Sequence, residues 1–182
     1  MDAPCRIPRL GTRTPVLGLD GGDLAAAIQT IIEVGDAGAV SEAVNSAFGG
    51  ASLEIANLPD GRFALEFRQN GLLRPLGTGE LSDGTLRFLL WLAALLMPRP
   101  PSMMVLNEPG TSLHPDLLPA LSGLIIKAAE KTQVWVVTHS PALSSSLTED
   151  SGSRLIELQR EFGQTQAKGE NLLDRPQWGW VE

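Results

Sequence analysis

Two short stretches decide the fold: MMVLNEP at Met103–Pro109 and VWVVTHSP at Val134–Pro141. Each starts with four consecutive apolar residues and ends in polar ones. An unbroken apolar run of this length is typical of a strand that is covered on both faces in a parallel sheet. The segment between them, Pro115–Lys131, has the length and apolar content of a helix. Strand, helix and strand in this order predict a βαβ unit, and therefore an α/β fold with a parallel core.

Polar side chains follow both predicted strands. Asn107 and Glu108 come after the first strand, and His139 comes after the second. Carboxyl ends of parallel strands lie at one edge of the sheet, where open α/β sheets bind ligands, so we expect Glu108 and His139 to lie close together. A carboxylate there can polarise a water molecule, and the Asn107 oxygen can reach a Mg²⁺ shell. Taken alone, the first motif can equally be read as the polar end of a buried strand. For the second, the structural reading is the better one, since a lone histidine at a strand end is more often structural.

A third motif, LSDGT at Leu81–Thr85, stands directly before a long apolar helix pattern, Leu86–Met97. Ser82 is a favourable N-cap, and Gly84 allows backbone to approach a ligand closely. The free amides of a helix start, its dipole and a hydroxyl group together form a site for an anion. Taken alone, the simpler interpretation is a capped helix entry.

The chain before this motif has a different texture. Residues 1–18 carry three prolines and three arginines and predict an irregular lead-in. Further elements are expected as follows: a helix at Leu24–Val34 with Asp23 as its cap, a second helix at about Ala39–Phe48, and an antiparallel hairpin that turns at Asp60–Gly61. Short strands are expected at 154–159 and 165–167, with Trp178 and Trp180 docking the end. We divide the chain into residues 1–76, helices plus hairpin, and 77–182, the βαβ core with the C-terminal strands.

Composition excludes several classes of protein. The formal net charge is -7, from 14 basic and 21 acidic residues, which argues against tight nonspecific binding of DNA by this segment. Cys5 is the single cysteine, so no disulfide can form within the chain, and a Cys/His metal site has no support. The longest apolar run, Phe88–Met97, is too short to span a bilayer. We expect a cytoplasmic location.

The three motifs and the residues between them resemble the second half of an ABC-type ATPase head, of the SMC-like and RecF-like kind. Leu81–Thr85 resembles the signature motif, and Met103–Glu108 resembles the Walker B strand. Thr111–Pro115 is similar to the D-loop, with Ser112, Leu113 and His114 at its centre. Thr138–Ser140 resembles the switch-histidine motif. Each motif is weak alone, but four in the right order make a specific pattern, strongest between residues 76 and 143.

The resemblance implies a fold and roles. The fold would be the C-terminal lobe of a P-loop NTPase of the ABC type. Ser82, Asp83, Gly84 and Thr85 would bind the γ-phosphate of ATP held by an opposing head, in trans. Glu108 would orient the attacking water, and His139, also catalytic, would sense the γ-phosphate. The cofactors would be ATP and Mg²⁺, and the partner a second ATPase head or a P-loop lobe.

This sequence departs from the family pattern in two respects. Asn107 stands where the family has a carboxylate for the Mg²⁺ shell, so we expect weak metal support there. The sequence contains no Gly-x-x-x-x-Gly-Lys-Ser/Thr motif, and Lys127, Lys131 and Lys168 are its only lysines. We therefore expect a fragment, a truncated product or one part of a split ATPase, inactive alone.

Two functions follow from these observations. The first is the catalytic half of an ATPase. The alternative is a non-enzymatic interaction or dimerisation module derived from such an ATPase. With either function we expect a homo-oligomer. The two strands are apolar on both faces, and without a neighbouring lobe their apolar surface favours association, unless residues 1–18 fold back and cover it. Binding of nucleic acid is possible for a longer protein that contains this segment, but the segment itself does not support it. We do not expect binding to a membrane.

Overall fold

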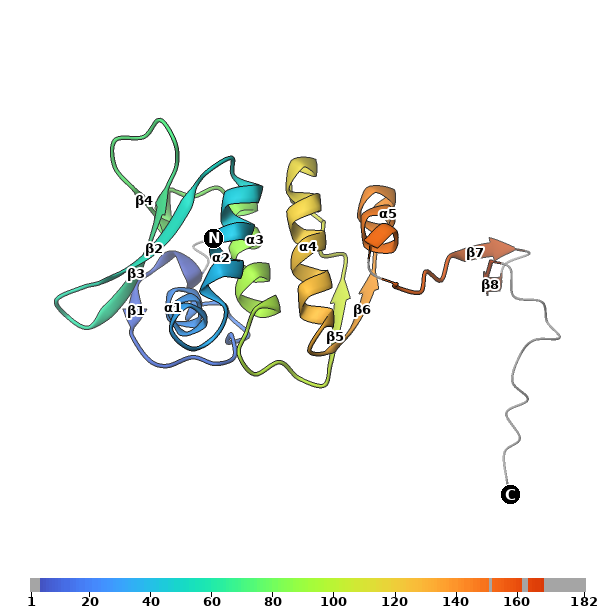
Figure 1. The fold of residues 1–182 in the computed structure, drawn as a ribbon, viewed down its shortest axis with the longest axis horizontal. Helices are drawn as coiled ribbons and strands as arrows, with labels where there is room; N and C mark the ends of the chain where they lie inside the picture. Colours follow the sequence, from blue (N-terminus) through green and yellow to red (C-terminus); the bar gives the residue numbers. More distant parts are fainter. Residues whose placement is uncertain (1–3, 151, 162–163, 169–182) are drawn as a thin grey trace, which may run out of the picture.

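The computed structural model describes residues 4–150, 152–161 and 164–168. Figure 1 shows helices α1, α2 and α3 beside an antiparallel sheet, followed by the β5–α4–β6 unit and α5. The described elements are η1 Pro4–Arg6, β1 Arg9–Leu10, α1 Leu24–Val34, α2 Ala37–Ala47, β2 Ser52–Asn57, β3 Arg62–Arg68, β4 Leu76–Gly77, η2 Thr78–Glu80, α3 Asp83–Leu95, β5 Met103–Asn107, η3 Pro115–Leu117, α4 Leu118–Ala129, β6 Gln133–Val137, α5 Pro141–Asp150, β7 Leu158–Glu161 and β8 Gln164–Ala167. Trp178 and Trp180 lie outside the described residues.

Helices α1 and α2 form where the apolar spacing predicts them, but the cap expected for α1 is wrong. The Asp23 side chain makes no hydrogen bond to the α1 backbone. Its two carboxylate oxygens instead accept the Gly18 amide, at 3.0 and 3.1 Å. Helix α2 has a working cap, because Asp36 accepts the Ala39 amide at 2.8 Å. Asp23 therefore stabilises the loop before α1, while Asp36 stabilises a helix start.

The antiparallel sheet confirms the predicted hairpin. Strands β2 and β3 pair along their length, from Ser52 opposite Arg68 to Asn57 opposite Phe63. Gly61 in the turn has a φ of 79°, which glycine adopts without a steric cost. The lead-in at 1–18 is less irregular than expected, since β1 pairs with β3 on the side away from β2.

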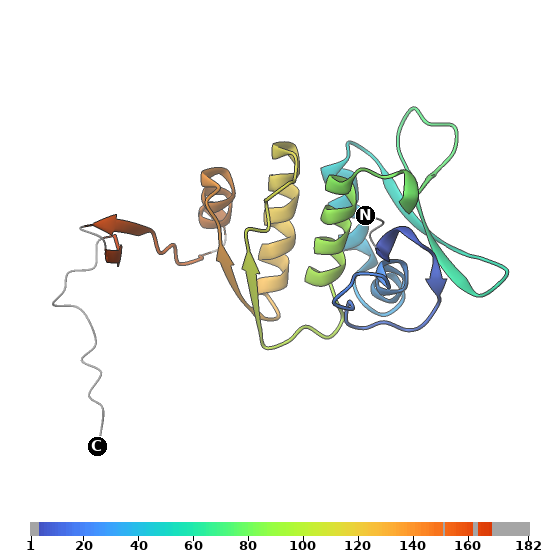
Figure 2. The ribbon, with the colours of Figure 1, turned by 180° about the vertical axis from the view of Figure 1, so that it is seen from behind.

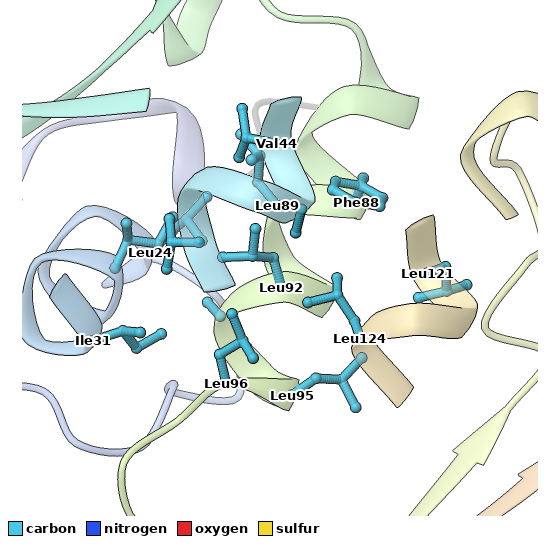
Figure 3. Close-up of a cluster of buried hydrophobic side chains, with 14 of the residues drawn as sticks. Leu24, Ile31, Val44, Phe88, Leu89, Leu92, Leu95, Leu96, Leu121 and Leu124 are labelled. Carbon is cyan, nitrogen blue, oxygen red and sulfur yellow. The ribbon is translucent and has the colours of Figure 1, made fainter. Parts of the chain in front are cut away.

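The core is built around α3. Its side chains Phe88, Leu89 and Leu92 are fully buried, and Figure 3 shows leucines of α4 and residues of α1 and α2 around them. The ring of Phe48 meets Phe67 and Phe88 edge to face, with centroids 5.1 and 5.3 Å apart. A helix that is apolar on most of its surface has to be surrounded in this way.

Strands β5 and β6 are parallel, with Met104 opposite Val134 and Asn107 opposite Val137. They lie side by side next to α4 (Figure 2). This confirms the predicted βαβ unit. The expectation of cover on both faces is wrong for the described part of the chain, because every second side chain is about half exposed. These side chains are Met103, Val105, Trp135 and Val137, with 48, 59, 58 and 51% of their surface exposed. We call these four residues the open face.

Among the described residues, no helix is both long enough and apolar enough to cross a membrane.

Candidate functional site

Glu108 stands at the point where β5 ends. Its amide donates a hydrogen bond to the carbonyl oxygen of Val137 at 2.8 Å, which extends the parallel pairing by one residue. Its φ is 48°, a left-handed conformation that is uncommon for a residue other than glycine. Such backbone conformations are frequent at functional sites, because the surrounding structure has to impose them. The chain thus turns sharply at Glu108, just past the strand.

Glu108 and His139 meet at the carboxyl edge of the β5–β6 pair, as the sequence predicts. The His139 amide donates a hydrogen bond to Oε2 of Glu108 at 3.3 Å, and Nε2 of its ring lies 3.6 Å from Oε1. The His139 side chain is 95% exposed, whereas that of Glu108 is 28% exposed. A half-buried carboxylate therefore faces an imidazole that is free to contact a ligand.

One oxygen of Glu108 has no hydrogen-bond partner. Oε1 is buried, and no described residue donates a hydrogen bond to it; the His139 ring at 3.6 Å is too distant. Buried carboxylate oxygens are almost always paired, so an unpaired one calls for a ligand or a water molecule. The chemistry open to this oxygen is to accept a proton or a hydrogen bond from water.

Ser82 caps α3, as predicted. Its Oγ accepts the Thr85 amide at 3.1 Å and lies 2.9 Å from Oγ1 of Thr85. The helix therefore starts at Asp83 with ordered hydroxyl groups at its positive end. Gly84, in the first turn, lies against the next motif, since a Cβ added to it would be 3.5 Å from the carbonyl oxygen of Ser112.

The loop 108–114 joins Glu108 to the start of α3. The Thr111 amide donates to the carbonyl oxygen of Glu108 at 3.0 Å, and Nη1 of Arg87 on α3 donates to the carbonyl oxygen of Thr111 at 3.3 Å. Ser112 has a φ of 66°, a second left-handed residue in the same loop. Leu113 packs against the core. The expected D-loop thus connects the backbone at the end of β5 to α3.

His114 has a local structural role. Its Nδ1 accepts the amide of Asp116 at 3.3 Å and so caps the short helix η3. The side chain is 71% exposed. The sequence pattern did not indicate this cap.

The sequence did not point to Arg6 as part of the site. Its guanidinium lies 2.5 Å from Oδ1 of Asp83, in the expected signature motif. The lead-in carries no pattern that would pair it with a helix 77 positions away. Just before the motif in the chain, Glu80 accepts hydrogen bonds from Arg74 and from the amide of Gly77, which together lower the pKa of its carboxyl to about 2.

A magnesium ion would find few ligands here. No described group of three or more His, Cys, Asp or Glu residues could hold a metal ion. Asn107 is exposed at the end of β5 and offers one neutral carbonyl oxygen. Mg²⁺ commonly uses one or two carboxylates together with substrate phosphates and water. Asn107 and Glu108 therefore supply only part of a ligand set for Mg²⁺, and phosphate oxygens would have to supply the rest.

Comparisons with known proteins show the family and the fold of this chain. Residues 16–145 match a family model described as "AAA domain, putative AbiEii toxin, Type IV TA system". No curated protein matches the sequence.

Solved structures similar in fold include heads of SMC proteins. One, described as "Structural biochemistry of ATP-driven dimerization and DNA stimulated activation of SMC ATPases", has a TM-score of 0.57 and 15% identity over 80% of this chain and 88% of its own. The Smc head domain with a coiled coil and joint from Pyrococcus yayanosii also has a TM-score of 0.57 and 15% identity, over 77% of this chain and 27% of its own. The SMC head domain from Thermotoga maritima has a TM-score of 0.52 and 19% identity, over 80% of this chain and 50% of its own. The chain thus spans half or less of the last two structures.

Proposed function

Because this chain belongs to the AAA domain family whose description names the AbiEii toxin of type IV TA systems, and shares its fold with SMC heads, we propose that it acts within an ATPase. Specifically, it would supply the signature and Walker B half of an ABC-type, SMC-like or RecF-like head that binds and hydrolyses ATP. The observation that carries this proposal is the contact between Glu108 and His139 at the end of two parallel strands. A separate P-loop would have to complete the site.

Glu108 would act as the general base. Its buried, unpaired Oε1 is suited to orient the attacking water and to take up a proton from it. The exposed ring of His139, 3.6 Å away, would donate a hydrogen bond to the γ-phosphate. ATP would be the substrate, and bound Mg²⁺, supported weakly by Asn107, would neutralise phosphate charge.

The start of α3 would serve a second nucleotide. Ser82, Gly84 and Thr85 would contact the γ-phosphate of ATP held on an opposing head, and Asp83 would lie beside it. What supports these roles is the start of α3, which is capped by Ser82 and carries the positive end of the helix dipole. The loop with Ser112, Leu113 and His114 would couple the two sites, since it bonds both Glu108 and α3.

Completion of the site requires a P-loop, whose backbone amides and lysine normally hold the phosphates. The open face offers a surface for the lobe that carries it, because four apolar side chains there are about half exposed. The partner would be such a lobe or a second head, in a homo-oligomer or a split enzyme.

The test is ATP turnover by the chain joined to a P-loop lobe, with the chain alone and the lobe alone as controls. The lobe can be grafted from an SMC head, whose fold this chain shares. We expect hydrolysis only in the joined form, and expect Glu108→Gln to slow it by about a hundredfold or more. Equal turnover with Glu108→Gln would contradict the assignment of the base.

The alternative is a non-enzymatic interaction or dimerisation module. Asn107 in place of a carboxylate and the open face favour it. In that case the joined form would assemble but show no turnover, and Glu108→Gln would change nothing.

A further inference from the structure

Arg6 is bound to the entrance of α3 by four contacts. Its Nη1 donates hydrogen bonds to the carbonyl oxygens of Thr78, Gly79 and Leu81, at 3.1, 3.3 and 2.9 Å. Its Nη2 lies 2.5 Å from Oδ1 of Asp83. In return, Oγ1 of Thr78 donates to the Arg6 carbonyl oxygen at 2.9 Å. Only 18% of the Arg6 side chain is exposed, so the guanidinium is held in place and is not a free surface charge.

The partner of Arg6 is the one acidic residue of the expected anion site. Asp83 is the first residue of α3, and its side chain is 90% exposed. A carboxylate at a helix start interacts favourably with the helix dipole. It also opposes any phosphate that approaches the same amides, because like charges repel. Three carbonyl oxygens at 78, 79 and 81 add partial negative charge beside it.

We propose that Arg6 is a positioning residue for the anion site at Ser82–Thr85: by pairing with Asp83 and these carbonyl oxygens, it removes the negative charge that would otherwise repel a phosphate. Arg6 acts through Asp83 and not by contact with the ligand, since both terminal nitrogens of its guanidinium bind the protein and only 18% of its side chain is exposed. This inference rests on the proposed function for the identity of the ligand, a polyphosphate.

Arg74 offers a matched control. It also carries a positive charge on the segment that leads into α3, but it pairs with Glu80 of η2, at 2.6 Å, and not with Asp83. Its other contact is to the carbonyl oxygen of Pro75 at 3.1 Å. A general loss of positive charge near the motif would make both variants alike, whereas the proposed role belongs to Arg6 alone.

The experiment follows the backbone amides of Gly84 and Thr85 by NMR while inorganic pyrophosphate is added to the isotope-labelled full chain. Five proteins are compared: the parent, Arg6→Met, Asp83→Asn, the Arg6→Met/Asp83→Asn double variant and Arg74→Met. We expect Arg6→Met to raise the dissociation constant roughly two- to fivefold, the range of a single exposed charge at a helix end. The double variant should return to the parent value or bind more tightly, and Arg74→Met should match the parent.

The rescue by Asp83→Asn separates charge from shape. If Arg6 were only a clamp for the backbone carbonyls, Asp83→Asn would change the dissociation constant by the same factor with and without Arg6, whereas the proposed role requires a larger gain in the Arg6→Met background. A double variant as weak as Arg6→Met would therefore overturn the proposal, as would an unchanged Arg6→Met or a parent chain whose amides do not respond. If Arg6→Met fails to fold, Arg6→Gln with and without Asp83→Asn provides the same comparison, because glutamine removes the charge but keeps N–H donors for the backbone carbonyl oxygens.

This readout does not depend on hydrolysis. A normal pyrophosphate response in a chain that shows no turnover with any P-loop lobe would count against the proposed function and leave the role of Arg6 standing. Turnover that is insensitive to Arg6→Met would count against Arg6 alone.

Discussion

The amide of His139 donates a hydrogen bond to Oε2 of Glu108 at 3.3 Å, across 31 positions of the chain. The parallel register of β5 and β6 makes this contact possible, since it aligns Asn107 with Val137 and brings the next residues of both strands to one edge. The contact involves the backbone of His139, so substitution of the ring leaves it in place. Glu108 and His139 can thus be varied separately.

We expect Glu108→Gln to slow ATP hydrolysis by about a hundredfold or more in a head completed with a P-loop lobe, as for loss of a positioned general base. Glutamine keeps the size of the side chain and an acceptor for the His139 amide, so ATP binding should persist. Single-turnover kinetics and nucleotide titration measure the two effects. Asp116→Asn, which removes an exposed carboxylate from η3, is the control. Parental turnover with Glu108→Gln would reduce Glu108 to a strand-end residue.

Ser82→Ala should lower the free energy of unfolding by about 1 kcal/mol, because the Thr85 amide loses its N-cap acceptor. Chemical denaturation measures this loss. Ser82→Asp keeps an acceptor and should retain stability, but it adds a negative charge to the anion site. Ser82→Arg should block pairing of completed heads. A fully stable Ser82→Ala protein would show that the cap contributes nothing.

The chain alone should bind Mg-ATP weakly or not at all and should show no turnover. Its sequence has no P-loop motif whose backbone amides and lysine would hold the phosphates. Calorimetric titration is the measurement. A micromolar dissociation constant would contradict the prediction.

We expect the chain alone to associate, most simply as a two-fold dimer that buries the open face. Val105→Lys and Trp135→Lys should weaken this association, because each places a charge in the interface. Leu73→Lys is the control, since Leu73 is also exposed but lies in the loop after β3. Size exclusion with light scattering measures the mass. A monomer at every concentration would refute the dimer. The described part of the arm, residues 4–18, is directed to the other sheet, where its strand β1 pairs with β3.

The ion pair of Glu80 with Arg74 should make stability depend on pH in acid. The pKa of Glu80 is lowered from 4.5 to about 2 in the folded chain. Its contribution is therefore present above pH 4.5 and is lost as the pH falls towards 2. Both groups are exposed, so the effect is small. Thermal melting of the parent and Glu80→Gln between these pH values measures it; identical curves would show that the pair contributes nothing.

The sequence alone determined features that depend on local pattern. Unbroken apolar runs predicted β5 and β6, and their polar ends predicted that Glu108 and His139 meet. The position of Ser82 directly before an apolar helix pattern predicted that it caps this helix. These inferences succeeded because strand pairing in a βαβ unit and helix capping follow from spacing over a few residues. The catalytic and binding roles of these residues stay predictions.

Only the tertiary structure decided features that join distant segments. It placed the Arg6 guanidinium on Asp83, turned the Asp23 carboxylate to Gly18 and, within the described residues, left one face of β5 and β6 open. A side chain's partner depends on which segments pack together, and no periodic pattern encodes a contact between an irregular lead-in and a helix 77 positions later. Likewise, an apolar strand shows that it needs cover, but what covers it depends on the elements folded around it.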